Sequence, residues 1–158
     1  SRKDVQRWDP NSRSMRTFAV RRARAIAAQV VQRPVVFVDT ETTGLSPSDQ
    51  VVQFAAVSLS GEVLVNSLVK PTIPIPARSS QIHGIYDEDV AAAPTWKDLW
   101  PTAEPHLHGA LIGAFNMPFD VRMLRSSFAQ NGMACPIADA DTFCVMALAA
   151  AFLCRNSV

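Results

Sequence analysis

In the first half of the chain, apolar residues gather into three short segments bounded by polar residues, and each segment predicts a strand. A run of large apolar residues at Val35–Asp39 predicts a buried strand that ends at a carboxylate. Two further apolar segments, Gln50–Leu59 and Glu62–Lys70, are separated only by Ser60-Gly61. Because that dipeptide is typical of a tight turn, we expect these two strands to form an antiparallel hairpin.

The second half of the chain predicts helices that alternate with short strands. The expected elements are an extended loop at Pro71–Pro76, short helices near Ser79–His83 and Trp96–His108, a strand at Leu111–Phe115, a helix at Asn116–Asn131, a strand at Ile137–Ala140 and a helix at Thr142–Leu153. The helix at Asn116–Asn131 has Asn116 as its cap, Pro118 in its first turn and Gly132 as its stop. This order predicts an α/β fold, a mixed sheet with helices on both faces.

The N-terminal segment differs in charge from the rest of the chain. Residues 1–33 carry nine basic and two acidic residues, a net charge of +7, whereas residues 34–158 carry six basic and twelve acidic residues, a net charge of −6. Apolar residues recur at helical spacing between Ser14 and Gln32, which predicts a helix with most of its arginines off the apolar stripe. We therefore expect a basic arm and helix at 1–33 and a folded domain at 34–158. The arm either packs on the acidic domain or contacts nucleic acid.

The composition favours a folded domain and gives no sign of a membrane or secreted protein. An apolar content of 48% is typical of a folded domain. No apolar run approaches the roughly 20 residues that a membrane span needs, and the arginine-rich N-terminus does not have the pattern of a secretory signal. The three cysteines are odd in number and lack metal-type spacing, so we expect buried free thiols in a reducing compartment. These features predict a cytoplasmic protein with no membrane contact.

The candidate chemistry lies where the first strand ends. Asp39 and Glu41 are two residues apart, and strand side chains alternate, so both should project to the same side. Two such like charges repel, and a divalent cation such as Mg²⁺ would relieve the repulsion. Asp120, in the first turn of a later helix, approaches this pair if the strand before it lies beside the first strand. The alternatives are a plain acidic turn and, for Asp120, a contact with the helix dipole worth about 0.3–1 kcal/mol.

Taken together, these residues resemble the DnaQ-like 3′–5′ exonucleases of the DEDD superfamily, and most of all the epsilon proofreading subunits of bacterial DNA polymerase III. The resemblance runs from about Pro34 to Phe152. Its motifs are a first motif at Phe37–Leu45, a second at Asn116–Asp120, an epsilon-type loop at Ile82–Ile85 with Asp87–Val90, and the pair Asp141-Thr142. The resemblance implies a ribonuclease H-like fold with a mixed five-stranded sheet, flanking helices and an extra N-terminal helix.

The resemblance also implies a two-metal hydrolysis with Mg²⁺ or Mn²⁺, in which Asp39, Glu41 and Asp120 are the catalytic residues and metal ligands. It places Thr42, His83, Asn116 and Phe119 at the substrate. Core packing is the alternative for Phe119, and a capped loop residue is the alternative for His83. The implied partners are the 3′ ends of single-stranded DNA or RNA, and a DNA polymerase subunit.

One part of the family pattern is absent from the numbered residues. The third motif of the family carries a histidine followed closely by an aspartate, and no histidine follows Asp120. We expect that the numbered residues stop short of this motif; a fragment and a degenerate nuclease are the alternatives. The functional hypotheses are therefore an exonuclease for single-stranded DNA, a non-catalytic module that binds nucleic acid or a polymerase, and an RNA 3′-exonuclease.

Overall fold

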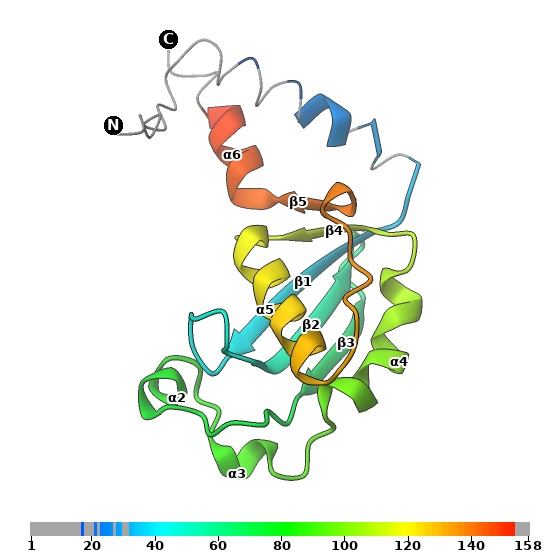
Figure 1. Cartoon of the computed structure of the whole chain (residues 1–158). Coiled ribbons are helices and arrows are strands. Elements are labelled where there is room, and N and C mark those ends of the chain that lie inside the picture. Colours follow the sequence, from blue (N-terminus) through cyan, green and yellow to red (C-terminus); the bar gives the residue numbers. More distant parts are fainter. Residues whose placement is uncertain (1–16, 18–20, 22, 27, 30–31, 154–158) are drawn as a thin grey trace, which may run out of the picture.

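A computed structural model describes residues 17, 21, 23–26, 28–29 and 32–153 of the chain, and within them five strands form one mixed sheet (Figure 1). The strand order is β3-β2-β1-β4-β5, so β1 is central. β1 pairs antiparallel with β2 and parallel with β4; β2 pairs antiparallel with β3, and β4 pairs parallel with β5. The strands are β1 at Val35–Thr42, β2 at Val51–Ser58, β3 at Val63–Leu68, β4 at Leu111–Ala114 and β5 at Thr142–Cys144. The predicted hairpin and the predicted five-stranded mixed sheet are confirmed.

The helices of the domain follow the predicted order, with one short helix, α3, that was not predicted. They are α2 at Ala77–His83, α3 at Asp87–Val90, α4 at Trp96–Leu107, α5 at Met117–Gln130 and α6 at Val145–Leu153, with a 3₁₀ turn at Asp139–Asp141. Of the helix expected at Ser14–Gln32, residues 17, 21, 23–26 and 28–29 are helical, and its remaining positions up to 31 lie outside the described residues. None of the helices in the described part of the chain is long and apolar enough to cross a membrane.

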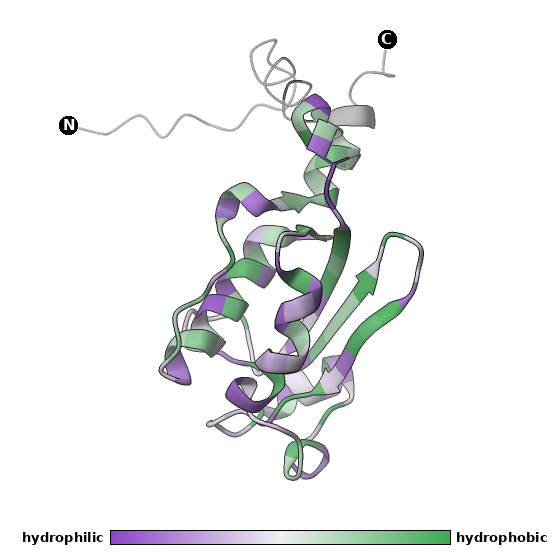
Figure 2. Ribbon diagram, turned by 90° about the vertical axis from the view of Figure 1, so that its right-hand side faces the viewer, coloured by the Kyte–Doolittle hydropathy of each residue, from purple (hydrophilic) through white to green (hydrophobic). Residues whose placement is uncertain are grey.

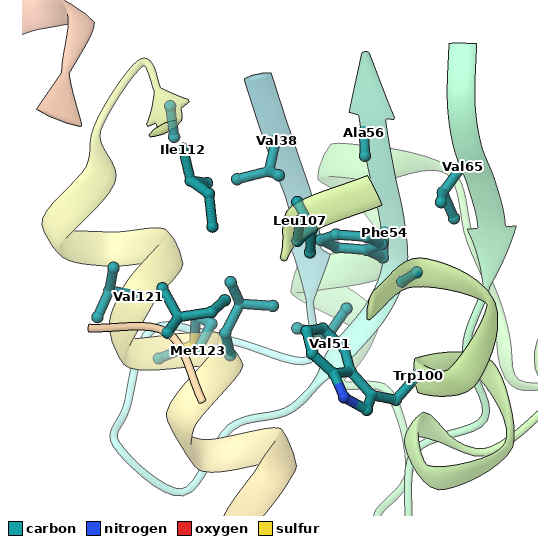
Figure 3. Close-up of a cluster of buried hydrophobic side chains, with 14 of the residues drawn as sticks. Val38, Val51, Phe54, Ala56, Val65, Trp100, Leu107, Ile112, Val121 and Met123 are labelled. Carbon is teal, nitrogen blue, oxygen red and sulfur yellow. The ribbon is translucent and has the colours of Figure 1, made fainter. Parts of the chain in front are cut away.

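The main core lies between one face of the sheet and the helices α4 and α5. Val36 and Val38 of β1 point to this face, and Trp100 of α4 meets Phe128 of α5 with 4.7 Å between ring centroids. Figure 3 shows the side chains of this cluster converging from β1, β2, β3 and β4 onto the two helices. In Figure 2 the strands are mostly in the green of apolar residues, while purple residues gather on the helices and loops. Burial on one face therefore fixes which side chains of β1 face away from the core.

Among the described residues, those that cover the opposite face of the sheet lie at its β4–β5 side. There Val35, Leu111 and Phe143 form a second cluster with Ile26 from the N-terminal helical residues, and α6 packs against it through Val145 and Leu148. Helices therefore lie on both faces, as predicted. Beyond Phe37, the same face of β1, β2 and β3 forms an open hollow.

The prediction for the last strand is wrong. The apolar residues at Ile137–Ala140 do not form a strand; Ile137 is buried in the main core, and the chain then turns through the 3₁₀ segment. β5 lies at Thr142–Cys144 instead, so α6 starts at Val145 and not at Thr142. The reason is the pairing with β4, in which Phe143 lies opposite Gly113. A side chain at Gly113 would come within 2.8 Å of the Cε1 atom of Phe143, so glycine makes room for that ring.

A smaller apolar cluster supports α2 and α3 at the other end of the molecule. It consists of Val52, Ile75, Ile85 and Val90, which share no residue with the main core. The loop before α2 is fixed by a hydrogen bond from the Ile75 backbone N–H to Oδ1 of Asp87, 2.9 Å long. The segment that carries the predicted epsilon-type loop is thus packed separately from the main core.

Candidate active site

The two carboxylates of β1 lie on the same face of the sheet, as their spacing predicts. Asp39 is exposed and Glu41 is partly exposed. They pair across the strands with Ala55 and Gln53 of β2. The hollow that both line has a volume of about 290 Å³ and is completed by Gln53, Ala55, Val57, Val63 and Asn66. The floor of the hollow is therefore apolar and amide-bearing, and the two carboxylates supply its negative charge.

Asp120 reaches β1 from the opposite face. It lies in the first turn of α5, directly after β4, and β4 is the parallel neighbour of β1, as the prediction for Asp120 requires. Asp120 is only 4% exposed, and its Oδ1 accepts a hydrogen bond of 2.8 Å from the hydroxyl of Thr40. Thr40 stands between Asp39 and Glu41 in the strand, so its side chain points away from theirs.

The surroundings of Asp120 disfavour its charged form. The pKa of Asp120 is raised from 3.8 to about 6, mainly by burial and also by the negative charges of Asp39 and Glu41, while the hydrogen bond from Thr40 acts to lower it. The three acidic side chains therefore repel one another through the strand. A nearby positive charge would therefore stabilise the charged form of Asp120.

The ligand atoms available here, carboxylate oxygens, are of the type that divalent cations bind. Carboxylate oxygens are the ligands that hard cations such as Mg²⁺ and Mn²⁺ take, and mutual repulsion of this kind is what a bound cation offsets. In the described residues, no three His, Cys, Asp or Glu side chains gather into a group that could hold a metal ion. Asp39 and Glu41 share a hollow, and Asp120 would have to join them through its second oxygen.

The loop after β1 is built around Asp49, a residue that the sequence analysis did not single out. Its carboxylate accepts hydrogen bonds from the hydroxyl of Thr43 at 2.8 Å and from the backbone N–H of Ser46 at 2.6 Å. Gly44 leaves room for this carboxylate, because a side chain there would lie 2.6 Å from Oδ2 of Asp49. Ser46 and Asp49 are three residues apart in a polar, proline-containing segment, which is the spacing of a side-chain-supported turn. This was the signal that could have indicated Asp49.

Two of the predicted substrate residues, Thr42 and His83, lie at the end of β1 and at the end of α2. Thr42 is buried, and its hydroxyl donates to the carbonyl of Gly44 at 2.7 Å, so it shapes the turn. His83 ends α2, and its Nδ1 accepts a hydrogen bond of 3.1 Å from the backbone N–H of Ile85, while its Nε2 is buried without a partner among the described residues. The hydroxyl of Ser79 on α2 donates to the carbonyl of Thr43 at 2.7 Å and ties that helix to the loop.

The other two predicted substrate residues lie at the start of α5. Asn116 is exposed at the N-cap position, as expected, but its side chain makes no capping hydrogen bond. Phe119 is partly buried and packs against the main core. The guanidinium of Arg122, which the sequence analysis missed, lies 5.6 Å from the Phe119 ring centroid and donates to the carbonyl of Leu45 at 3.2 Å. Arg122 thus links α5 to the loop after β1.

Comparison with known protein families identifies the type of domain. The model of the exonuclease family RNase T matches residues 36–157, which is more than half of the chain. This chain belongs to that exonuclease family. The resemblance drawn from the motifs is thereby confirmed.

Relatives of this exonuclease-family chain include phage and bacterial proteins. It is 38% identical over 117 residues to "Uncharacterized exonuclease CP81" of Escherichia phage 186, covering 69% of this chain and 54% of that protein. It is 44% identical over 99 residues to a "DNA polymerase III subunit epsilon-like protein" of Rhodobacter capsulatus, covering 58% of this chain and 14% of that protein. The chain thus spans about half of the first relative and a small part of the second.

Solved structures confirm the fold of this exonuclease-family chain. E. coli exonuclease I in complex with a dT13 oligonucleotide matches with a TM-score of 0.56 and 22% identity, covering 65% of this chain and 25% of that chain. Exonuclease I from Methylocaldum szegediense matches with the same TM-score and identity, covering 63% of this chain and 24% of that chain. The mixed five-stranded sheet with its flanking helices is therefore the exonuclease fold.

Proposed function

We propose that this chain carries a 3′–5′ exonuclease site that removes terminal nucleotides from single-stranded DNA with the help of two divalent cations, Mg²⁺ or Mn²⁺. The observation that carries this proposal is the placement of Asp39, Glu41 and Asp120 around the carboxyl end of the central strand, with the pKa of Asp120 raised by burial and by the other two charges. Family membership supports the same reaction class.

The roles of the residues follow from where they lie. Asp39 and Glu41 would hold cations in the open hollow, and Asp120 would contribute its second carboxylate oxygen. When bound, the cations supply an activated water and stabilise the leaving oxygen of the phosphodiester. Hydrogen bonds from Thr43 to Asp49 and to the carbonyl of Gln50 tie the two ends of the loop after β1 together, and the backbone groups of this loop would contact a terminal nucleotide.

The substrate end would lie between that loop and α5. Phe119 offers an aromatic ring near Asp120, and stacking of a base on such a ring is worth about 1–3 kcal/mol. His83 has a buried Nε2 without a partner in the described structure, which makes it a candidate donor to the substrate. Thr42 and Asn116 border the same region of β1 and α5.

The proposed partner is a DNA polymerase, and support for it comes from the name of the R. capsulatus relative. Support for single-stranded DNA comes from the oligonucleotide complex of the E. coli structural neighbour. An RNA 3′ end is the alternative substrate of the same site.

A non-catalytic module that binds nucleic acid or a polymerase is a second candidate. The observation that favours it is that no three-ligand metal group forms within the residues that the structure describes. Such a module would bind single strands but would not shorten them in the presence of Mn²⁺.

The deciding experiment follows the length of 5′-labelled single-stranded DNA and RNA oligonucleotides with purified protein in Mg²⁺, Mn²⁺ or EDTA. We expect a ladder of products shortened from the 3′ end, abolished by EDTA and by Asp39→Asn. Glu62→Gln, which neutralises an exposed carboxylate in the β2–β3 turn, is the matched control and should leave the ladder intact. Equal rates for Asp39→Asn and the wild type would exclude the proposed site, and binding without shortening would favour the second candidate.

A further inference from the structure

Thr40 occupies an unusual place in the candidate active site. It stands between Asp39 and Glu41 in sequence, yet its side chain lies on the opposite face of β1, where it meets Asp120. Both partners are buried, Thr40 at 7% and Asp120 at 4% exposure, and the hydrogen bond between them is 2.8 Å long. Among the described residues, Thr40 is the only one whose side chain donates to Asp120.

The position of Thr40 itself is strongly fixed. Thr40 lies opposite Phe54 in the antiparallel ladder with β2, and the parallel pairing of β1 with β4 precedes it, at Val35–Phe37. A β-branched side chain in a strand has few rotamers, so the direction of the hydroxyl-bearing arm is set by the backbone. The hydroxyl therefore defines where one oxygen of Asp120 must lie, although α5 carries that residue on a separate element.

The chemistry of the contact favours the charged form of Asp120. A hydrogen bond donated to a buried carboxylate is charge-assisted. It stabilises the charged form and so offsets part of the destabilisation that burial causes. Because the hydroxyl binds Oδ1, the second oxygen is the one left to turn toward a ligand. Because side chains alternate along β1, the carboxylates of Asp39 and Glu41 lie on one face of the strand. The hydroxyl of Thr40, which orients Asp120, lies on the other face.

We propose that Thr40 is a positioning residue of this site: its hydroxyl orients Asp120 so that the second carboxylate oxygen can join Asp39 and Glu41 in holding a divalent cation. This inference rests on the proposed function, because only there is Asp120 a metal ligand. The nucleic acid does not need to touch Thr40 for this role.

The test measures Mn²⁺ affinity of the purified protein without nucleic acid, by electron paramagnetic resonance of free Mn²⁺. Thr40→Val removes the donor and keeps the shape, and we expect it to weaken Mn²⁺ binding about 10- to 100-fold, the usual effect of losing a group that orients a ligand. Thr40→Ser keeps a hydroxyl and should retain the affinity. In turnover assays, Thr40→Val should lower kcat and leave KM near the wild-type value.

Thr95→Val is the matched control. Thr95 donates to a carboxylate as well, Oδ2 of Asp98 at 2.6 Å, but at the N-cap of α4. Its loss should lower the melting temperature without changing Mn²⁺ affinity. Melting in EDTA then separates a loss of stability from a loss of cation binding, and Thr40→Ala serves as a second variant without the hydroxyl if the valine side chain prevents folding.

The outcomes are distinct. The inference is overturned if Thr40→Val and Thr40→Ala bind Mn²⁺ as tightly as the wild type, or if Thr40→Ser loses as much affinity as Thr40→Val. Absence of Mn²⁺ binding in the wild type would overturn the proposed function, and this inference with it. Tight binding in the wild type together with an unchanged Thr40→Val would overturn the inference alone.

Discussion

Replacing Asp120 with asparagine should stabilise the protein at neutral pH when no metal is present. Burial, together with the charges of Asp39 and Glu41 and against the hydrogen bond from Thr40, raises the pKa of Asp120 to about 6 in the folded protein, compared with 3.8 for the free side chain. A tenfold change in a proton equilibrium corresponds to about 1.4 kcal/mol, so the charged carboxylate destabilises the folded state by about 3 kcal/mol above this pKa. Asparagine carries no charge, and its oxygen can still accept the hydrogen bond from Thr40.

The sign of the pH dependence follows from the same shift. Between about pH 4 and pH 6 the folded protein holds a proton that the unfolded chain releases, so the stability of the wild type falls as the pH rises through this window. Above pH 6 the loss is complete. The Asp120→Asn variant lacks this contribution, so its free energy of unfolding should exceed that of the wild type by an amount that grows across the window to about 3 kcal/mol.

Urea denaturation in EDTA, followed by the fluorescence of the buried Trp96 and Trp100, measures this difference at several pH values. Asp98→Asn is a control of opposite sign, because the hydrogen bond from Thr95 lowers the pKa of the exposed Asp98. The stabilisation by Asp98 is present above the ordinary pKa and is lost as the pH falls. Equal pH slopes for Asp120→Asn and the wild type would refute the reasoning, and added Mn²⁺ should reduce the advantage of the variant.

Two further predictions concern the packing of the sheet. Gly113→Ala should lower the free energy of unfolding by about 1–3 kcal/mol, because the added methyl group meets the ring of Phe143. The double variant Gly113→Ala with Phe143→Leu should recover part of this loss. Full stability of the single variant in urea denaturation would contradict the clash. Arg33→Ala should cost about 1–3 kcal/mol in the same assay, because the guanidinium donates to the carbonyls of Gly109 and Ala110 at 3.0 and 2.7 Å and pairs with Asp141. Arg33→Lys keeps the charge but not the forked geometry and should recover little, and an unchanged stability of Arg33→Ala would show that these contacts are replaced by water.

The strands near the site could be predicted because local pattern and tertiary demand agree there. The run at Val35–Asp39 is apolar because β1 is central and buried, and the hairpin between β2 and β3 is set by the Ser60-Gly61 turn. The alternation that puts Asp39 and Glu41 on one face is a property of any strand. These features need no knowledge of distant residues.

The last strand could not be predicted for the opposite reason. The segment Ile137–Ala140 has the stronger apolar pattern, but Ile137 is buried without ladder pairing. Which residues form β5 depends on the fit of Phe143 over Gly113, a contact between positions 30 residues apart. Local propensity cannot predict such a fit, because the preference of a residue for a strand reflects its packing against side chains on neighbouring strands.

Within the candidate site, the sequence predicted that Asp39 and Glu41 share a face and that Asp120 approaches β1, but not which side chain contacts Asp120. Nothing in the residues around Thr40 distinguishes it from any strand threonine, and its bond to Asp120 exists only because α5 lies over β1. The cap position of Asn116 was predicted correctly, whereas its side-chain bond is absent. A burial-driven shift in a pKa is likewise a property of the assembled fold.

The separate packing of α2 and α3 bears on how such a domain can change. Their cluster of Val52, Ile75, Ile85 and Val90 shares no residue with the main core, and Ser79 attaches α2 to the loop after β1 through one backbone carbonyl. Apart from Val52 of β2, this cluster comes from the segment between β3 and α4, so that segment has an apolar core distinct from the main one. A substitution within α2 or α3 should therefore disturb this small cluster and the contact of Ser79 with the loop after β1 before it disturbs the main core.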